Sequence, residues 1–181
     1  MGLTIVVSVL VIVVIAVTFL VFLNIRNDLV RQRNELGKAL LNLDQLLKQR
    51  RDELPKLLGT CRSYLPDDSG LIASVSTARA AEQKAASPAE KARAAAELQS
   101  ALQALFAAGD RVAPLELNTS YRQLKKSIRA LEEKIGVEQA RLNLQVTSYN
   151  SRLRAFPGNL VARMARLGTQ APFKVRNGSR H

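Results

Sequence analysis

The sequence predicts an all-α protein in which an N-terminal transmembrane helix continues into an antiparallel, up-and-down four-helix bundle. Two observations support this fold class. Residues 3–23 are uncharged, and the rest of the chain carries apolar residues at helical spacings of three, four or seven. Outside the uncharged run, no segment has the alternation that predicts a strand. We expect a transmembrane anchor (1–25), a helical bundle (26–168) and a basic C-terminal tail (169–181).

The uncharged run has the length and composition of a membrane span. As a helix it measures about 32 Å, close to the roughly 30 Å of hydrocarbon in a bilayer. Of its 21 residues, 17 are Val, Ile, Leu or Phe, so insertion contributes on the order of −5 to −10 kcal/mol. A domain of this size could not surround such a helix in its core, and a cleaved signal would carry a basic flank and a small-x-small site. We therefore expect a retained anchor.

Charge near the anchor predicts its orientation. Arg26, Arg31 and Arg33 follow the run with only Asp28 against them, whereas the N-terminal flank has no basic side chain. The positive-inside rule places Met1 outside and the domain in the cytoplasm. This corresponds to a single-pass protein of a cell membrane.

The first helix of the bundle is expected to continue from the anchor to about Tyr64. Apolar residues recur along one face of it: Leu36, Leu40, Leu43, Leu47, Leu54 and Cys61. The lone Cys61 excludes an intramolecular disulfide and is expected to be a small buried side chain. Pro55 should kink the helix or leave one hydrogen bond unmade near Arg51. Arg51, Asp52 and Pro55 are therefore candidate structural or partner-binding residues.

The middle of the chain predicts two shorter helices. A Pro-Asp-Asp-Ser-Gly turn at 66–70 precedes a helix that opens near Leu71, and Ser87 to Glu90 has the pattern of a capping box with Pro88 at the first helical position. Residues 78–108 are rich in Ala, which favours helix but supplies little apolar bulk. Gly109 and Asp110 should end the third helix.

The fourth helix, expected over 117–155, carries the most regular heptad pattern. Its stripe, with Glu138 and Gln145 as polar exceptions, contains Leu117, Tyr121, Leu124, Ile128, Leu131, Ile135, Leu142, Tyr149 and Phe156. Phe156-Pro157-Gly158 should stop it, and 159–167 should form a short amphipathic helix. We name Tyr149, Asn150, Phe156 and Pro157 as structural candidates. Asn150 either bonds a turn or is exposed for a partner, and we favour the turn.

The sequence predicts no catalytic, cofactor or metal site. Its only His is His181 and its only Cys is Cys61, so a metal cluster cannot be assembled. Adjacent acids such as Glu132-Glu133 diverge by about 100° on a helix. A carboxylate-based enzyme is the alternative, and it would require two acids that converge in a buried pocket.

The C-terminal part of the chain is strongly basic. Residues 139–181 carry eight Lys or Arg and no acid, out of a net charge of +12. This charge could bind nucleic acid, with Tyr149, Phe156 and Phe173 as stacking groups. We instead favour membrane lipids, because Arg163 and Arg166 could meet anionic headgroups if the fourth helix returns toward the membrane.

Four segments resemble the LemA family of bacterial membrane proteins. They are NDLVRQRN (27–34), RRDELPKLL (50–58), EEKIGVEQAR (132–141) and YNSRLRAFPGNLVARMARLG (149–168). The sequence departs from the family pattern at Arg26, where the family usually has Tyr, at Lys56, and over 112–118. The resemblance implies one N-terminal anchor and an antiparallel four-helix bundle, with no established reaction. Relatives are associated with a membrane metallopeptidase of the heat-shock class or with magnetosome membranes.

From these observations we expect a non-enzymatic scaffold or adaptor at the bacterial inner membrane. Its expected partners are membrane lipids and membrane or cytoplasmic proteins. Self-association into a homo-oligomer through an exposed apolar edge is also expected, because the Ala-rich middle helices are thin. A nucleic-acid-binding module is the alternative of a different class.

Overall fold

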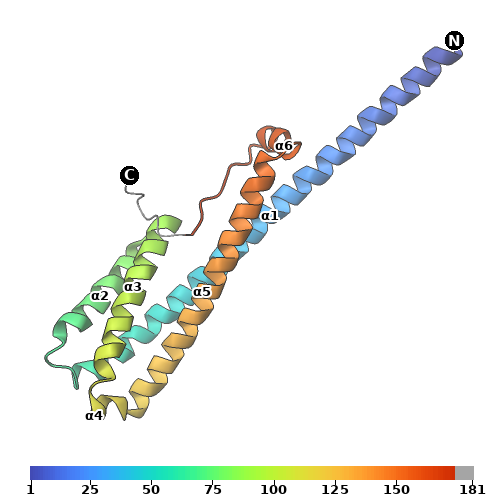
Figure 1. Ribbon diagram of the computed structural model, residues 1–181. Helices are drawn as coiled ribbons and strands as arrows, with labels where there is room; N and C mark the ends of the chain where they lie inside the picture. The colour runs from blue at the N-terminus through green and yellow to red at the C-terminus, as the bar shows by residue number, and fades with distance from the viewer. Residues whose placement is uncertain (174–181) are drawn as a thin grey trace. The chain divides into compact units, whose positions relative to one another are not determined.

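The computed structural model describes residues 1–173, and within them it contains six α-helices and no strand (Figure 1). The prediction of an all-α protein with a long N-terminal apolar helix is therefore confirmed. The helices are α1 (Gly2–Arg62), α2 (Ser69–Lys84), α3 (Pro88–Gly109), α4 (Ala113–Glu116), α5 (Thr119–Arg154) and α6 (Gly158–Met164). Residues 174–181 of the predicted basic tail, His181 included, lie outside the described residues.

The chain divides into two compact units. The first, which we call the anchor unit, contains residues 1–38 and 145–170. The second, the core unit, contains residues 39–144 and the chain from 171. The boundaries 1–25, 26–168 and 169–181 and the up-and-down order of a four-helix bundle stay predictions.

One apolar core holds the core unit together. Segments of α1, α2, α3 and α5 and the short α4 contribute buried side chains to it: Leu54, Leu57, Leu58, Cys61, Leu65, Ile72, Val75, Ala78, Leu98, Leu102, Leu105, Phe106, Leu115, Tyr121 and Ile128. Inside this unit α1 and α5 run antiparallel, because Arg50 bonds Glu132 while the later Tyr64 bonds the earlier Asn118. Burial raises the pKa of the Cys61 thiol to about 11, as expected for a packed rather than reactive cysteine.

Local sequence signals set the ends of α3, which lies beside α2 in Figure 1. The Ser87 hydroxyl accepts from the Glu90 N–H at 3.2 Å, and the Glu90 carboxylate accepts from the Ser87 N–H at 3.1 Å. The predicted capping box is confirmed. α3 ends at Gly109, where a Cβ would lie 2.3 Å from the Tyr121 hydroxyl oxygen. Only glycine allows this close approach of α3 to α5.

The heptad stripe of α5 is correct in its middle and wrong at both ends. Tyr121, Ile128 and Tyr149 are buried as predicted, but Leu117 and Phe156 are exposed. Both lie outside α5, which begins at Thr119 and ends at Arg154. The helical repeat determines which way a side chain faces only inside the helix, so it does not apply to Leu117 and Phe156.

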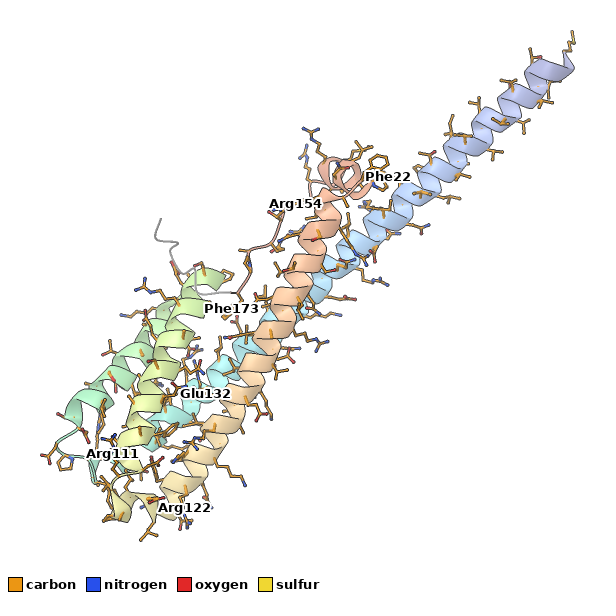
Figure 2. The ribbon with its side chains drawn as sticks, viewed as in Figure 1. Phe22, Arg111, Arg122, Glu132, Arg154 and Phe173 are labelled. Atoms are coloured by element: carbon orange, nitrogen blue, oxygen red, sulfur yellow. The ribbon has the colours of Figure 1, made fainter. Side chains whose placement is uncertain are left out.

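In the anchor unit, the first part of α1 is bare. Its side chains point outward around the helix in Figure 2, and the large apolar side chains described over residues 5–21 are exposed. By length and composition, α1 is long and apolar enough to cross a membrane. Packing begins at Phe22 and Leu23, which are partly covered.

Candidate functional site

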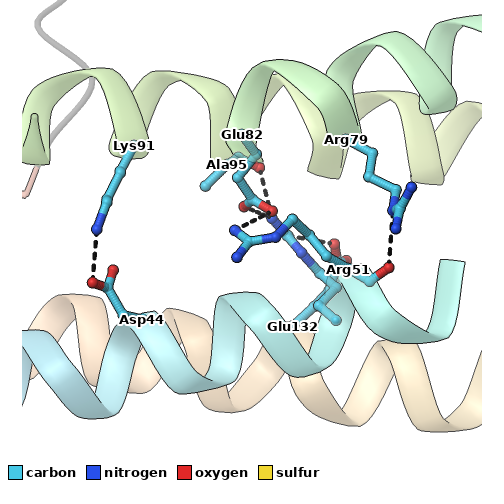
Figure 3. Close-up of polar contacts among 8 residues, drawn as sticks. Asp44, Arg51, Arg79, Glu82, Lys91, Ala95 and Glu132 are labelled. Carbon is cyan, nitrogen blue, oxygen red and sulfur yellow. Dashed lines mark hydrogen bonds and ion pairs between the residues drawn. The ribbon is translucent and has the colours of Figure 1, made fainter. Parts of the chain in front are cut away.

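A buried cluster of charges lies inside the core unit and joins four helices (Figure 3). Arg50 of α1 donates to the Glu82 carboxylate of α2 at 2.6 Å, to the Glu132 carboxylate of α5 at 3.2 Å, and to the Ala95 carbonyl of α3 at 3.4 Å. Arg51 donates a further bond to Glu82 at 3.4 Å. Arg50 and Glu82 are 1 % and 2 % exposed. Two arginines therefore balance two glutamates where solvent screens little.

The sequence analysis missed Arg50 and Glu82 as functional candidates. Arg50 follows Leu47 by three residues and precedes Leu54 by four, so it occupies a core-facing position of a buried stripe. Glu82 likewise follows the buried Ala78 by one turn. The signal that could have found them is a charge at an apolar position of the helical repeat.

Pro55 leaves one backbone carbonyl beside this cluster without its helical hydrogen bond. Proline has no N–H, so the Arg51 carbonyl one turn earlier has no partner within the helix. Arg79 of α2 uses this acceptor, donating from Nε to the Arg51 carbonyl oxygen at 3.0 Å. The hydrogen bond predicted to be missing near Arg51 is thus replaced by one that links α1 to α2. Asp52 is exposed.

A second tie lies closer to the surface. Lys91 of α3 bonds Asp44 of α1 at 2.7 Å, and both side chains are partly exposed. Lys125 of α5 also pairs with Asp110 at the end of α3. Such pairs add little stability in water, so the buried cluster is the dominant electrostatic feature of the core unit.

The composition of the charge cluster indicates a structural role, because its acids and arginines pair with one another. Burial raises the pKa of the Glu132 carboxyl, and the positive charge of Arg50 opposes that shift. Two acids thus converge on one guanidinium, which is half of the condition stated for a carboxylate enzyme. The other half is a pocket, and a pocket at these two acids stays untested: five cavities on the described surface are lined by other residues.

No group of three or more His, Cys, Asp or Glu is placed to hold a metal ion within residues 1–173. The carboxylates of Glu82 and Glu132 instead accept hydrogen bonds from Arg50 and Arg51. The arrangement can fix the helices in one register, because each charge would be left uncompensated if a helix shifted.

The anchor unit contains the other predicted site residues. Tyr149 is fully buried, and burial raises the pKa of its hydroxyl. The Asn150 amide donates to the Gln170 carbonyl at 2.8 Å and accepts from the Gln170 N–H at 2.9 Å. Asn150 therefore holds the chain that follows α6. At Gly158 a Cβ would lie 2.3 Å from the Arg152 carbonyl oxygen, so glycine is needed beside Pro157.

The helix expected over 159–167 is shorter in the structure. α6 ends at Met164 because Arg166 adopts a left-handed conformation with φ of 52°. The Leu167 N–H then bonds the Ala162 carbonyl at 2.9 Å, which is a Schellman cap. Arg163 and Arg166 are both exposed, but only Arg163 lies on the helix.

Around α6, apolar side chains face outward. Phe156, Leu160 and Met164 follow one another at four-residue spacing and are 84 %, 55 % and 66 % exposed. The sequence analysis had assigned Phe156 to the core and did not single out the other two. Of the three aromatic residues considered for nucleic acid, Tyr149 and Phe173 are buried, which leaves Phe156 accessible.

Comparison with known proteins supports the family resemblance. No curated protein matches the chain. The family model described as LemA family matches residues 39–181, well over half of the sequence. Together with the N-terminal apolar helix, this fits a membrane-associated protein. The chain therefore belongs to the LemA family.

Proposed function

We propose that this protein is a non-enzymatic scaffold, anchored in the bacterial inner membrane by α1, that presents a helical surface to protein partners. The observation that carries the proposal is a second apolar stripe on α5. Ala130, Val137 and Leu144 are exposed and lie seven residues apart, with Val137 at 61 % and Leu144 at 72 % exposure.

This exposed stripe lies on the side of α5 opposite the core. The buried stripe runs through Ile128, Ile135 and Leu142, two residues before each exposed member. Two residues correspond to about 200° around a helix. Isolated exposed apolar residues are normal, but three in a heptad row form a stripe, which we call the seam and propose as the surface on which a partner helix packs. The buried charge cluster supports the same role, because through Arg50 it ties this stretch of α5 to α1, α2 and α3.

The test is a pair of double variants of the full chain in native membranes. Val137→Lys with Leu144→Lys places two charges on the seam, whereas Leu41→Lys with Leu117→Lys places two charges on equally exposed apolar positions elsewhere in the core unit. Chemical cross-linking and co-purification should lose partners, or the ladder of a homo-oligomer, only in the seam variant. Equal recovery of cross-linked species from both variants would reject the seam. Light scattering in detergent distinguishes self-association from other partners.

Orientation is tested separately. The proposal places the core unit in the cytoplasm, as the positive-inside rule predicts. Protease added to spheroplasts should leave the core unit intact, and protease added to permeabilised cells should digest it. Digestion in intact spheroplasts would reverse the orientation without affecting the seam.

A further inference from the structure

The short helix α6 buries its small residues and exposes its large apolar ones. Gly158, Val161 and Ala162 are buried within the anchor unit, while the larger Phe156, Leu160 and Met164 face outward. A water-exposed helix normally turns such side chains inward. We call this outward row, Phe156, Leu160 and Met164, the α6 apolar face. It needs a covering that the described residues do not supply.

The position of the α6 apolar face within the anchor unit indicates what covers it. Phe156 lines a cavity of about 390 Å³ together with Asn24 and Ile25 of α1. Those two residues directly follow Leu23, the last residue of the uncharged run. If the run fills the hydrocarbon layer, Asn24 and Ile25 lie at its edge. The α6 apolar face then begins at the same depth, where headgroups meet acyl chains.

The charges around the α6 apolar face fit an anionic surface. Arg154, Arg163 and Arg166 are exposed, and the acid that lines the cavity beside Phe156, Asp28, is paired with Arg152. Arg166 also occupies the left-handed position of the helix cap, where glycine is the unstrained residue. Arg166 therefore places a cation at the end of α6 in a conformation that strains a residue with a Cβ.

We propose that α6 is a second membrane contact, which lies on an anionic bilayer surface next to the anchor. The α6 apolar face enters the boundary between headgroups and acyl chains, and Arg154, Arg163 and Arg166 contact lipid phosphates. The inference rests on the proposed anchoring by α1. It goes further because it assigns a lipid site to a helix that does not span the membrane.

Tryptophan quenching tests this contact, because the natural sequence has no tryptophan. The full chain is reconstituted into anionic phospholipid vesicles with or without bromine on the acyl chains near the headgroups. Phe156→Trp and, independently, Leu160→Trp report on the α6 apolar face. We expect their emission to fall roughly twofold in brominated vesicles, since an interfacial helix sits about 5–10 Å into this boundary.

Two matched variants separate the possible failures. Phe19→Trp lies inside the uncharged run and should be quenched if the anchor inserts. Asn34→Trp is exposed in the same unit, 11 residues after Leu23, or about 16 Å along the α1 axis, and should keep its emission. Quenching of Phe19→Trp without quenching of Phe156→Trp and Leu160→Trp overturns the α6 contact but not the anchoring. Lack of quenching of Phe19→Trp overturns both.

The charge requirement is tested in the Phe156→Trp background. Arg163→Glu with Arg166→Glu should reduce quenching in anionic vesicles and change it little in zwitterionic ones. The matched control, Arg111→Glu with Arg122→Glu, reverses two exposed charges of the core unit and should leave quenching unchanged. A tryptophan at 156 that is protected from aqueous iodide but not quenched by brominated lipid would show that protein covers the α6 apolar face, and would overturn the proposal.

Discussion

The buried charge cluster of the core unit and the Asp28–Arg152 pair of the anchor unit lie in opposite environments. In the core unit, Arg50 and Glu82 are almost completely buried, and their charges are matched by Arg51 and Glu132. In the anchor unit, the side chains of Asp28 and Arg152 pair at 2.5 Å but remain 29 % and 57 % exposed. The chemical groups are of the same kind. Removing one partner of the buried set leaves an uncompensated charge away from water, whereas water solvates either partner of the exposed pair.

This contrast also separates the two proposed roles. A buried, mutually compensated cluster can fix helix register but is inaccessible to a ligand. Arg154, Arg163 and Arg166 of the anchor unit are exposed instead, so they can meet a charged surface. Substitutions in the buried cluster should therefore cost more stability than substitutions in the exposed pair.

Arg50→Ala should have the largest effect on stability. It leaves Glu82 buried with only the longer bond from Arg51, and breaking a buried pair in this way costs about 3–5 kcal/mol. The measurement is thermal unfolding followed by circular dichroism, together with hydrogen exchange of α2 and α3, on the full chain in detergent.

A double replacement by apolar residues sharpens this prediction. Arg50→Met combined with Glu82→Met removes both charges and restores volume, so it should be clearly more stable than Arg50→Ala alone. If the double variant is no more stable than Arg50→Ala, an uncompensated buried charge does not account for the loss.

Glu132→Gln should have an intermediate, pH-dependent effect. Burial raises the pKa of the Glu132 carboxyl above its ordinary value of 4.5, so the folded state holds this proton more tightly than the unfolded state. The contribution of this group to stability is therefore complete below pH 4.5 and is lost as the pH rises through the folded-state pKa. Gln stays neutral throughout. The unfolding free energy of wild type relative to Glu132→Gln should therefore fall with rising pH, and a constant difference would show that burial does not perturb this carboxyl.

Asp28→Asn should have the smallest effect. The Asp28 carboxylate also accepts from Arg31 and Gln32, both at 2.7 Å, but these bonds lie close to solvent. A loss of less than about 1 kcal/mol is expected, and high salt should reduce it further. Hydrogen exchange near the end of α5 at low and high salt measures this loss. A loss as large as that of Arg50→Ala would remove the contrast between the two units.

The sequence by itself determined the all-α class, the long apolar first helix and most helix ends. These features depend on local rules: an uncharged run of bilayer length, the Ser87 capping box, and the periodicity through Tyr121 and Ile128. It also located the unmade hydrogen bond at Pro55. The missing N–H of proline is a property of one residue and does not depend on the fold.

The tertiary structure alone shows which residue donates to the free Arg51 carbonyl and which charged side chains are buried. Arg79 reaches the Arg51 carbonyl, and Glu82 and Glu132 meet at Arg50, across 28 to 82 residues of sequence. Helical periodicity indicates which side of a helix faces inward, but it does not indicate which residue of another helix lies opposite. The predicted burial of Phe156 is wrong for a different reason: α5 ends at Arg154, so the helical repeat no longer determines which way Phe156 faces.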